Sequence, residues 1–499
     1  MRSTLFFYKK FLIGICVLCP GIKATAQENS NTALGNRFAK YQRSVLTEKI
    51  FIHTDKTFYL AGDVIWFKIY CTAGLQNEKS RISSVSYVEL LNKDQKPVMQ
   101  AKVSIDKGTG NGYFSLPSSL PSGNYMIRGY TNWMKNFSPD FYYHLPITIV
   151  NTFANQSLPP VFHREALDFQ FFPEGGNLVA GLRSRIGFKA VNEFGEAVNC
   201  SGIIVNEKAD TIVRFETAHA GMGSFIFTPD KLHSYYAVLL LYDSVIRKEL
   251  PEISSKGYVM SLSADSSNLE ITVHATADFE NLPVTLFAGT GQIIKEVVNG
   301  QIVHGETSFK ISREKLDDGI SHLTLFNAQH LPVCERLYFK CPITTMKIDV
   351  KMNQNSYGIR QRIDVDVTSL YASQIVEANL SMSVFLIDSL QSIPDQNIVT
   401  YLMLTSDLKG KIESPEYYLN AGNPGVAQAT DNLMLTQGWR RFNWKTVLEN
   451  EKEPVLSYLP EIEGHIVSGR IIDKHSGLPA KSVTGYISSP GLELLPLSD

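Results

Sequence analysis

The chain has 499 residues, of which 44% are hydrophobic and 19% are charged, and its formal net charge is −2. A charge this close to neutral excludes a whole-chain field that attracts nucleic acid or anionic membranes. The length predicts about three to five domains, and the 11% aromatic residues, 34 glycines and 22 prolines favour strands and turns.

Residues 1–26 have the pattern of a secretory signal peptide. Basic residues precede an apolar run from Phe11 to Cys19, and the small residues Ala24–Ala26 form the expected cleavage site. A membrane anchor is a less favoured alternative, because the run is about half of the roughly 20 residues that a spanning helix needs. A lipoprotein signal is also disfavoured, since neither Cys16 nor Cys19 follows a small residue. We expect an exported protein with no transmembrane segment after signal cleavage.

The cysteines that remain after signal removal are Cys71, Cys200, Cys334 and Cys341. Only the last two are close in sequence, and the residues between them have a strand pattern. Seven strand steps of about 3.3 Å would place them roughly 23 Å apart, whereas a disulfide tolerates about 4.4–6.8 Å between Cα atoms. We therefore predict buried free thiols rather than a disulfide framework.

Alternation of apolar and polar residues, which is typical of strands, begins after a polar leader segment at 27–46. It continues through 47–152, where an Ala-Gly-Asp turn at Ala61–Asp63 interrupts it. Pro159 and Pro160 mark a linker, and further sets of short strands occupy 160–252 and 257–343. Breaks at intervals of about 100 residues, without alternating helices, predict an all-β chain of tandem β-sandwich domains with few short helices.

A fourth β-sandwich with a mixed C-terminal segment is predicted at 344–450. Past about residue 391 the apolar residues recur at helical spacing, and Asp431 is a candidate cap for a short helix. Residues 461–499 alternate again around a turn at Asp473–Pro479. We interpret this last stretch as the start of a further sandwich that is cut short.

Motifs for catalysis are absent after the signal, because no H-E-x-x-H, Walker A, G-x-S-x-G or paired C-x-x-C occurs there. The stretch Gly108–Gly112 lies between two strands, so no helix start would meet a phosphate. His53, Asp55 and Asp63 could gather around a metal, but the alternation puts the first two on a half-exposed strand face and Asp63 in a turn. We predict no enzyme activity, no cofactor and no metal site.

Residues 439–444, which read WRRFNW, are a candidate interaction patch. Cations and aromatic rings could form a platform for single-stranded nucleic acid, but one such patch in a near-neutral chain favours packing at a domain edge. The segment Phe171–Val179 is interpreted as strand residues with a Gly-Gly turn beside Glu174, which explains its glycines without a ligand. The patch consists of Trp439, Arg440, Arg441, Phe442 and Trp444.

Residues 48–70 and 110–134 resemble the MG2-type macroglobulin domain of the alpha-2-macroglobulin superfamily. The opening pattern of that domain is T-D-K/R-x-x-Y-x-x-G-D/E-x-I/V-x-F. The residues that match it are Thr54, Asp55, Lys56, Tyr59, Gly62, Asp63, Ile65 and Phe67. The resemblance implies a macroglobulin-like β-sandwich at 47–152 and further sandwiches of this type after it.

A more extensive resemblance is to exported Bacteroidetes proteins with macroglobulin-like domains, which often continue into a carboxypeptidase-regulatory-like sandwich and a TonB-receptor plug-like domain. The stretches YTNWMKNF, FFPEGGNLVAGLRSRIGFKA, SDLKGKIESPEYY and LMLTQGWRRFNW carry it, and VSGRIIDKHSGLPAKSV is similar to the first strands of the regulatory-like sandwich. The resemblance implies a periplasmic or outer-membrane location and envelope partners such as a TonB-dependent transporter. No plug-like part is found in these residues.

Protease-trapping members of the superfamily carry a Cys-Gly-Glu-Gln thioester, and none of the cysteines after the signal has that context. We therefore expect a non-enzymatic envelope protein that binds or scaffolds partners through strand edges and interdomain clefts. A glycan-active enzyme, a further alternative, would need two inward carboxylates about 5 to 10 Å apart, which the sequence cannot place. The first alternative is a thioester-independent protease inhibitor whose bait loop lies at 420–432, with Asn420, Gly422, Pro424, Gly425 and Ala429 as candidate residues.

Overall fold

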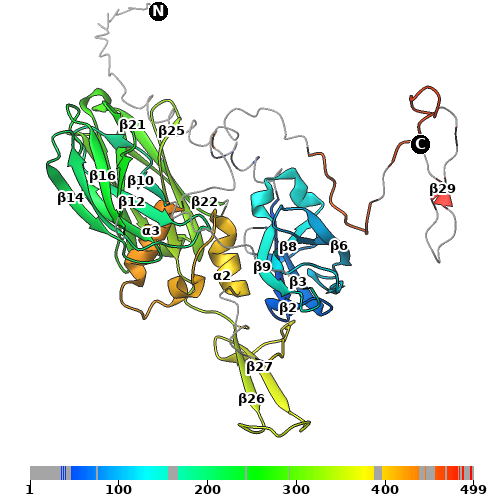
Figure 1. Cartoon of the computed structure of the whole chain (residues 1–499). Coiled ribbons are helices and arrows are strands. Elements are labelled where there is room, and N and C mark those ends of the chain that lie inside the picture. Colours follow the sequence, from blue (N-terminus) through cyan, green and yellow to red (C-terminus); the bar gives the residue numbers. More distant parts are fainter. Residues whose placement is uncertain are drawn as a thin grey trace, which may run out of the picture.

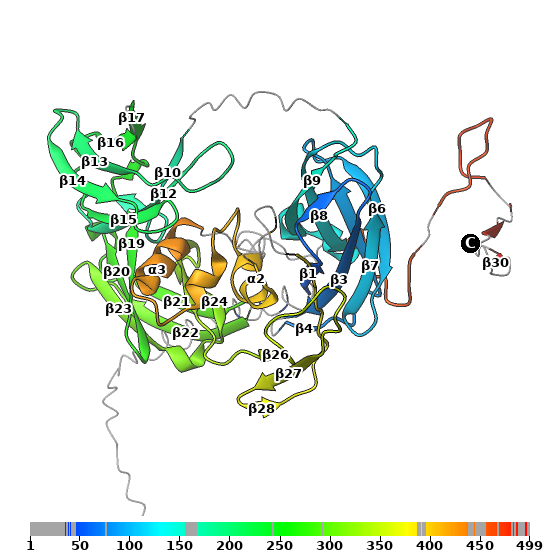
Figure 2. The same ribbon diagram turned by 60° about the horizontal axis from the view of Figure 1, so that its bottom comes forward.

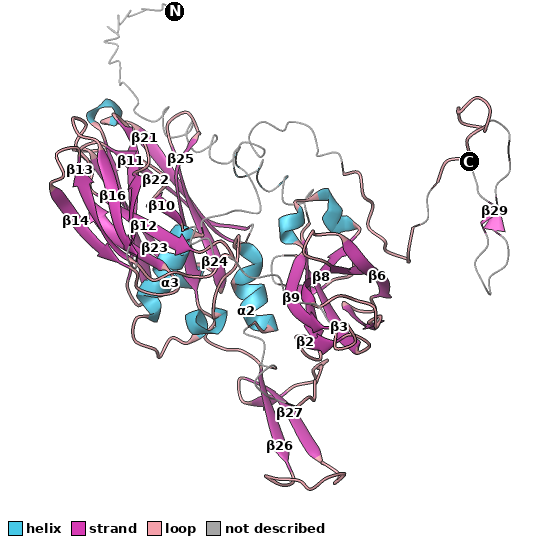
Figure 3. Cartoon of the chain, in the orientation of Figure 1, coloured by secondary structure: helices cyan, strands magenta, loops and turns pink. Residues whose placement is uncertain are grey.

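The computed structural model describes residues 46–74, 77–154, 167–241, 244–291, 293–386, 396–437, 456–466 and 469–480, with isolated residues that include Phe38 and Trp444 (Figure 1). Its regular structure is mostly antiparallel strand in small sheets, and the helices are few and short (Figure 3). This confirms the predicted all-β class and is consistent with tandem β-sandwich domains. The predicted signal peptide at 1–26 lies outside the described residues.

The first sandwich has two sheets that share one core. In one sheet β3 pairs with β1, β4 and β7, and the other sheet has the order β2-β9-β8-β5-β6. The strands are β1 (Glu48–Thr54), β2 (Phe58–Leu60), β3 (Val64–Ala73), β4 (Glu78–Lys79), β5 (Val85–Leu91), β6 (Pro97–Ser104), β7 (Thr109–Ser115), β8 (Gly123–Thr131) and β9 (Tyr143–Val150).

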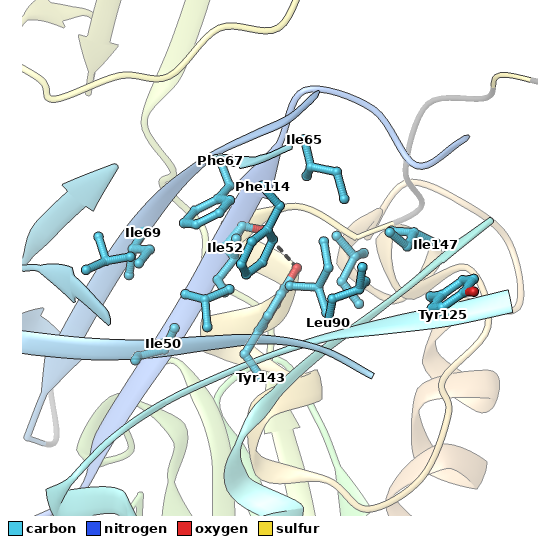
Figure 4. Packing of buried hydrophobic residues seen from close by; sticks show 14 of the residues in the cluster. Ile50, Ile52, Ile65, Phe67, Ile69, Leu90, Phe114, Tyr125, Tyr143 and Ile147 are labelled. Carbon is cyan, nitrogen blue, oxygen red and sulfur yellow. Dashed lines mark hydrogen bonds between the residues drawn. The ribbon is translucent and has the colours of Figure 1, made fainter. Parts of the chain in front are cut away.

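Alternating apolar residues from both sheets form the core of the first sandwich (Figure 4). Ile50 and Ile52 of β1 and Ile65 of β3 are at most 1% exposed, as the alternation predicts. The Tyr143 hydroxyl donates to the carbonyl oxygen of Ile52 at 2.9 Å. The phenol therefore enters the core without leaving a buried polar group unsatisfied.

The strand β1 is more buried than its sequence predicts. Alternation predicts a half-exposed strand, but Phe51, on the face opposite to Ile50 and Ile52, is only 7% exposed. The ring of Tyr401, from a distant helix, lies 5.7 Å from the ring of Phe51 between centroids. A helix from elsewhere in the chain thus covers the face that the local pattern leaves open.

The second sandwich packs a sheet β10-β12-β15 against a sheet β14-β13-β16-β17, with a small parallel pair β11-β18. Aromatic rings fill its core: the Phe188 centroid lies 5.4 Å from that of Phe169 and 4.9 Å from that of Phe215. The strands are β10 (Asp168–Pro173), β11 (Leu178–Val179), β12 (Ser184–Val191), β13 (Ser201–Asn206), β14 (Thr211–Glu216), β15 (Met222–Phe227), β16 (Tyr235–Leu241), β17 (Ser244–Glu249) and β18 (Ile253–Ser254).

The third sandwich packs a sheet β19-β20-β23 against a sheet β22-β21-β24-β25. The strand β24 is buried on both faces, because its inner residues face the core and Ile320, on the outer face, is covered by residues from a helical segment. The strands are β19 (Tyr258–Ala264), β20 (Asn268–Ala275), β21 (Pro283–Thr290), β22 (Ile293–Gln301), β23 (Glu306–Ser312), β24 (Gly319–Phe326) and β25 (Pro332–Lys340).

A small sheet follows, formed by β26 (Lys347–Met352), β27 (Val365–Tyr371) and β28 (Gln374–Ile375). It projects away from the sandwiches at the bottom of Figure 1, and we call it the projecting sheet. The described part of the predicted fourth domain, 344–450, contains this one sheet and then helices, without a second sheet that faces it. The difference arises because the residues after 391 have helical rather than strand spacing.

The helical segment (396–437) contains α2 (Ile398–Met403), the 3-10 turns η5 (Thr405–Asp407) and η6 (Pro415–Leu419), and α3 (Val426–Thr436). The side chain of Asn397 accepts hydrogen bonds from two backbone amides at the start of α2, as a helix cap does. The prediction that Asp431 caps a helix is wrong. It lies inside α3, which begins after Gly425, and its carboxylate binds two arginines described below.

Near the end of the chain, a turn occupies the predicted position. The Asp473 carboxylate accepts from the backbone amides of His475 at 3.0 Å and Ser476 at 2.7 Å, and these bonds lower the pKa of Asp473. The two-residue strands β29 (Tyr486–Ile487) and β30 (Leu495–Pro496) pair farther on. The turn within the predicted final sandwich is confirmed, and the sandwich itself stays a prediction.

Candidate interaction site

The residues of the macroglobulin-like opening pattern form a hydrogen-bonded turn. The Tyr59 hydroxyl donates to the Asp55 carboxylate at 2.7 Å, and the same carboxylate accepts from the Trp66 amide at 3.0 Å. Lys56 pairs with Asp63 at 2.8 Å. Burial, followed by the bond to Asp55, raises the pKa of Tyr59. The two carboxylates therefore organise a turn, and among the described residues no group of three or more His, Cys, Asp or Glu side chains could hold a metal ion.

His53, the third candidate of the rejected metal site, faces another part of the chain. Its Nδ1 lies 2.6 Å from the hydroxyl of Ser381, which follows the projecting sheet. Burial lowers the pKa of His53, while neighbouring Asp55 raises it and Lys68 lowers it. Burial therefore favours the neutral form of His53.

The four cysteines that the structure describes are free thiols, as predicted. Cys71, Cys200 and Cys334 are buried, and Cys341 is partly buried. Burial raises the pKa of Cys200 to about 11 and that of Cys334 to about 12. Since the thiolate is the reactive form, these two residues are poor nucleophiles at neutral pH.

The helical segment lies between the first sandwich and the other two (Figure 2). On the side of the first sandwich, Tyr401 of α2 packs against Phe51 and Tyr143, with ring centroids 5.7 and 5.3 Å away. Lys49 of β1 pairs with Asp407 at 2.8 Å and also donates to the Leu402 carbonyl. These contacts join α2 to the outer face of β1.

The other end of the helical segment contacts the second and third sandwiches. Leu433 and Met434 of α3 share one buried cluster with Met222 of β15 and with Leu337 and Phe339 of β25. The residues of this cluster come from both sandwiches and from the helix, so apolar burial holds the three together. A segment of about forty residues thereby touches all three sandwiches.

A cluster of four charged residues, two of them buried and two partly exposed, reinforces this junction. Glu174 binds Arg336 at 3.0 Å and Arg185 at 3.4 Å, and Asp431 of α3 binds both arginines at 2.5 Å. The Glu174 and Arg336 side chains are only 1% and 2% exposed. Glu174 also accepts from the Leu262 amide at 3.1 Å. Two acids and two bases thus balance their charges, which is what buried ions require.

The sequence reading of Glu174 missed this role. The segment does turn at its glycines, both of which have positive φ, but the Glu174 side chain points to partners far away in sequence. The carbonyl of Gly175 accepts from the Glu335 amide at 3.2 Å, which links the second sandwich to β25. The sequence shows which residues are arginines and acids, but their spacing does not indicate which of them pair.

A cavity of about 460 Å³ lies beside the charged cluster. Its wall comes from three sources: the end of β10, the strands β24 and β25, and α3. Arg336 faces it but is already paired with Glu174 and Asp431. The apolar part of the wall includes Phe171, Pro173, Val333, Met434 and Leu435.

The projecting sheet has one apolar and one polar face. In the register of β26 and β27, Val350 lies opposite Val367 and Met352 opposite Val365, so all four share a face with Ile348. Their exposed fractions range from 37% to 58%. Among the described residues, β26 has no strand on its other side. The sheet therefore presents an exposed apolar face and a free strand edge.

Residues just after the projecting sheet hold it against the first sandwich. Lys68 of β3 donates to the Leu380 carbonyl at 2.7 Å and to the Asn379 side chain, and Tyr70 donates to Ser381 at 2.8 Å. With the contact of His53, these bonds fix the base of the sheet on the outer face of β1 and β3.

The candidate bait residues divide into two environments. Residues 420–425 form an exposed turn before α3, whereas Ala429 lies in α3 and is 3% exposed. The part of the predicted loop that is not helical is therefore six residues long, because 426–432 belong to α3. The residues in the turn are Asn420, Gly422, Pro424 and Gly425.

Of the candidate interaction patch, Trp444 is described and is buried. It packs against Phe38, Phe287 and Phe326, with centroid distances of 5.0, 6.0 and 4.8 Å. Its indole donates to Thr324 at 3.1 Å. Trp444 thus packs against the third sandwich, as the packing interpretation expected. The other patch residues, Trp439, Arg440, Arg441 and Phe442, lie outside the described residues.

No model of a known protein family matches the chain, and no curated protein matches it in sequence. Among solved structures, it is similar to Escherichia coli alpha-2-macroglobulin activated by porcine elastase, with 11% identity and a TM-score of 0.22 over 66% of this chain and 33% of that one. It is also similar to Salmonella alpha-2-macroglobulin reacted with methylamine, with 10% identity and a TM-score of 0.18 over 64% of this chain and 25% of that one. A third match is dimeric latent PorU from Porphyromonas gingivalis, with 9% identity and a TM-score of 0.26 over 58% of this chain and 34% of that one.

Two of these matches are to bacterial alpha-2-macroglobulins. The matched region spans 25% to 33% of the length of the two macroglobulins. Their activities and partners are therefore not assigned to this chain. Within the part of the chain that the structure describes, no helix is long and apolar enough to cross a membrane.

Proposed function

We propose that this chain is a non-enzymatic exported protein of the bacterial envelope that binds or scaffolds other envelope proteins. The projecting sheet carries the proposal, because its apolar face is exposed and the described residues leave the β26 edge free. Such an edge binds an extended segment of a partner by adding it as a further strand. The partner segment would pair along Lys347–Met352, and its apolar side chains would lie beside Ile348, Val350 and Met352 on the same face.

The rest of the molecule supports a binding role rather than catalysis. The acids of the charged cluster are each bound by two arginines, so both carboxylates already serve structural ion pairs. The buried thiols have raised pKa values, which disfavours them as nucleophiles. The helical segment packs against all three sandwiches, and the projecting sheet extends from this packed unit.

The proposed location of the protein and the proposed class of its partner are inferred from the sequence. The pattern of residues 1–26 supports export. The resemblance to Bacteroidetes proteins with macroglobulin-like and TonB-receptor plug-like domains supports an outer-membrane partner, for which a TonB-dependent transporter is the specific proposal. The thioester-independent protease inhibitor ranks second, because only residues 420–425 form an exposed turn and the rest of the bait candidate is helix.

A photo-crosslinking amino acid at Val350 of the full chain tests the proposal in the envelope of the source bacterium. We expect one major crosslinked protein, identified by mass spectrometry, with crosslinked positions confined to one extended segment of that protein. The variant Ile348→Lys, which adds a charge to the same apolar face, should abolish most of this product. A crosslinker at Leu232, which is 85% exposed on the second sandwich, serves as the matched control.

The outcomes separate the proposals. If a TonB-dependent transporter crosslinks to position 350 but not to position 232, the result supports the TonB-associated role. If a different envelope protein crosslinks only to position 350, the result supports the binding role alone. Recovery of proteases only, with cleavage within 420–425, would replace the proposal by protease inhibition. The same set of proteins at both positions, unaffected by Ile348→Lys, would refute a binding site on the projecting sheet.

A further inference from the structure

The outer face of the second sheet of the first sandwich carries three stacked tyrosines. Tyr87 of β5 and Tyr130 of β8 lie opposite each other in register, with ring centroids 5.5 Å apart and planes 10° apart. Tyr142 continues the stack, 4.6 Å from Tyr130. We call Tyr87, Tyr130 and Tyr142 the tyrosine face. It lies on the sheet opposite to the one that holds the projecting sheet.

Charged residues fix this face from both sides. Glu89 accepts hydrogen bonds from Tyr130 at 2.9 Å and from Arg128 at 2.8 Å. Lys135 places its ammonium group 4.7 Å from the centroid of Tyr87 and 5.7 Å from that of Tyr130. A cation above neighbouring rings is a favourable arrangement, and it leaves a positive charge on the side of the face that meets solvent or a ligand.

A segment from more than 300 residues away lies along this face. The side chain of Asn136 both donates to the Tyr458 carbonyl at 2.7 Å and accepts from the Tyr458 amide at 2.9 Å. Asn132 donates to the Leu459 carbonyl at 2.9 Å, and the Ser84 amide donates to the Glu461 carbonyl at 2.7 Å. We call residues 458–466 the docked segment. The main chain of this segment thus makes hydrogen bonds with three residues of the sandwich, Ser84, Asn132 and Asn136, and main-chain hydrogen bonds of this kind are common in peptide-binding sites.

One side chain of the docked segment is buried. The Glu461 side chain is 1% exposed, and its carboxylate accepts from the Tyr87 hydroxyl at 3.0 and 3.1 Å. His465 contacts the same carboxylate at 2.7 Å through Nδ1, and its Nε2 lies 2.7 Å from the ammonium of Lys102. Burial and the bond to Glu461 raise the pKa of Tyr87 to about 12, so its hydroxyl remains a donor. The sandwich therefore supplies Tyr87 as a donor to this carboxylate, and the docked segment itself supplies His465 and the Ile466 amide, which donates at 2.9 Å.

The other side chains of the docked segment contribute little burial. Leu459 and Ile462 are 65% and 61% exposed, and Tyr458 is 44% exposed while its ring lies 5.4 Å from the ammonium of Lys135. The segment is therefore held by main-chain hydrogen bonds, one carboxylate and one shared cation. Contacts of this kind bind a free peptide weakly, and attachment to the same chain keeps the segment bound through its high effective concentration.

We propose that the tyrosine face, with Asn132, Asn136 and Ser84, is a peptide-binding site that residues 458–466 of the same chain occupy reversibly. Its ligand class is an acidic peptide with an aromatic residue followed three positions later by a glutamate, as Tyr458 and Glu461 are spaced. Pro460 between them suits such a ligand, because proline favours an extended backbone and has no amide hydrogen to satisfy. A segment of a partner with the same pattern would compete with the docked segment.

This inference is independent of the proposed function at β26. The tyrosine face and the projecting sheet lie on different sheets of the first sandwich, and none of the contacts above involves β26–β28. A negative result for one of the two sites therefore does not count against the other. The test uses the full chain and a fluorescent peptide of sequence LSYLPEIEGHI, which is residues 456–466.

The full-chain variant Tyr458→Ala/Glu461→Ala should release its own segment and bind the peptide, measured by fluorescence anisotropy. The wild-type chain should bind the peptide at least about tenfold more weakly, because a site that is free a tenth of the time lowers the apparent affinity tenfold. Adding Asn136→Ala to the released variant should weaken peptide binding by about tenfold or more. A second released chain, in which glycines and serines replace 458–466, should bind like the first.

Two results would overturn the proposal. One is that neither released chain binds the peptide although circular dichroism matches the wild type, which would make the docked segment a permanent structural connection. The other is equal binding by the released chain and its Asn136→Ala derivative, which would place the peptide elsewhere. A peptide with alanine in place of Glu461 is the matched ligand control, and it should bind at least about tenfold more weakly because the buried carboxylate is lost.

Discussion

At the scale of single residues, the polar side chains in the opening pattern of the first sandwich serve the turn between β1 and β3. Asp55 accepts from both the Tyr59 hydroxyl and the Trp66 amide, and Asp63 pairs with Lys56. Each bond joins residues no more than eleven positions apart. The two acids that make this stretch resemble a metal site therefore form local hydrogen bonds and an ion pair instead.

Tyr59→Phe tests this account. Tyr59 is completely buried, so losing its hydroxyl leaves an oxygen of Asp55 with one donor fewer, and we expect a loss of about 1–3 kcal/mol in the free energy of unfolding. Urea titration of the full chain measures it. Tyr113→Phe is the matched control, because Tyr113 is 58% exposed, and it should change stability by less than about 0.5 kcal/mol. Equal effects of the two substitutions would contradict the structural role of the Tyr59 hydroxyl.

At the scale of elements, the helical segment decides how the sandwiches meet. It covers Phe51 of β1 through Tyr401 and covers Leu337 and Phe339 of β25 through α3. Short isolated helices have little stability in water, so α2 and α3 depend on this apolar burial. The helices and the sheet faces they cover therefore stabilise one another.

Leu433→Ala should weaken this packing. Leu433 in α3 is completely buried, and its truncation leaves a cavity that costs about 2–5 kcal/mol. Calorimetric or urea unfolding of the full chain gives the value. Gln428→Ala on the exposed side of the same helix controls for helix propensity and should change stability by less than about 0.5 kcal/mol. If Leu433→Ala were as mild as Gln428→Ala, α3 would not contribute to the junction in solution.

At the scale of the whole molecule, the charged cluster joins the second sandwich, the third sandwich and α3. Glu174 and Arg185 come from the second sandwich, Arg336 from the third, and Asp431 from the helix. A buried ion cluster adds little net stability over apolar packing, but removing one member leaves a charge uncompensated. The cluster therefore favours one relative arrangement of these three parts over others.

Glu174→Ala should be the most damaging single change. It removes the carboxylate of the second sandwich that binds Arg336, whose side chain is 2% exposed. Breaking a buried ion pair in this way costs about 3–5 kcal/mol. Asp364→Ala is the control, since it breaks an exposed pair with Arg362, and it should cost less than about 1 kcal/mol. Urea unfolding and small-angle scattering compare the variants. A Glu174→Ala chain with wild-type stability and dimensions would rule out a structural role for the cluster.

Sequence patterns predicted much of the fold. The apolar alternation of β1 and β3 places Ile50, Ile52 and Ile65 in a core, because side chains of a strand alternate between faces whatever lies beyond them. Helical spacing after residue 391 predicted the helical segment, and separation along one strand predicted that Cys334 and Cys341 do not bridge. These features depend on neighbours within about one element, and local residue order is enough to determine them.

Only the tertiary structure decided what the polar residues do over long distances. Glu174 finds Arg336 at a separation of 162 residues, and Asn136 finds Tyr458 at 322. Asp431 looked like a helix cap, yet it became an ion-pair partner because α3 packs beside two sandwiches. Periodicity determines which face of an element is apolar. Which charged or amide group meets which partner follows from how faces from distant parts of the chain come together, and burial then makes those pairings obligatory.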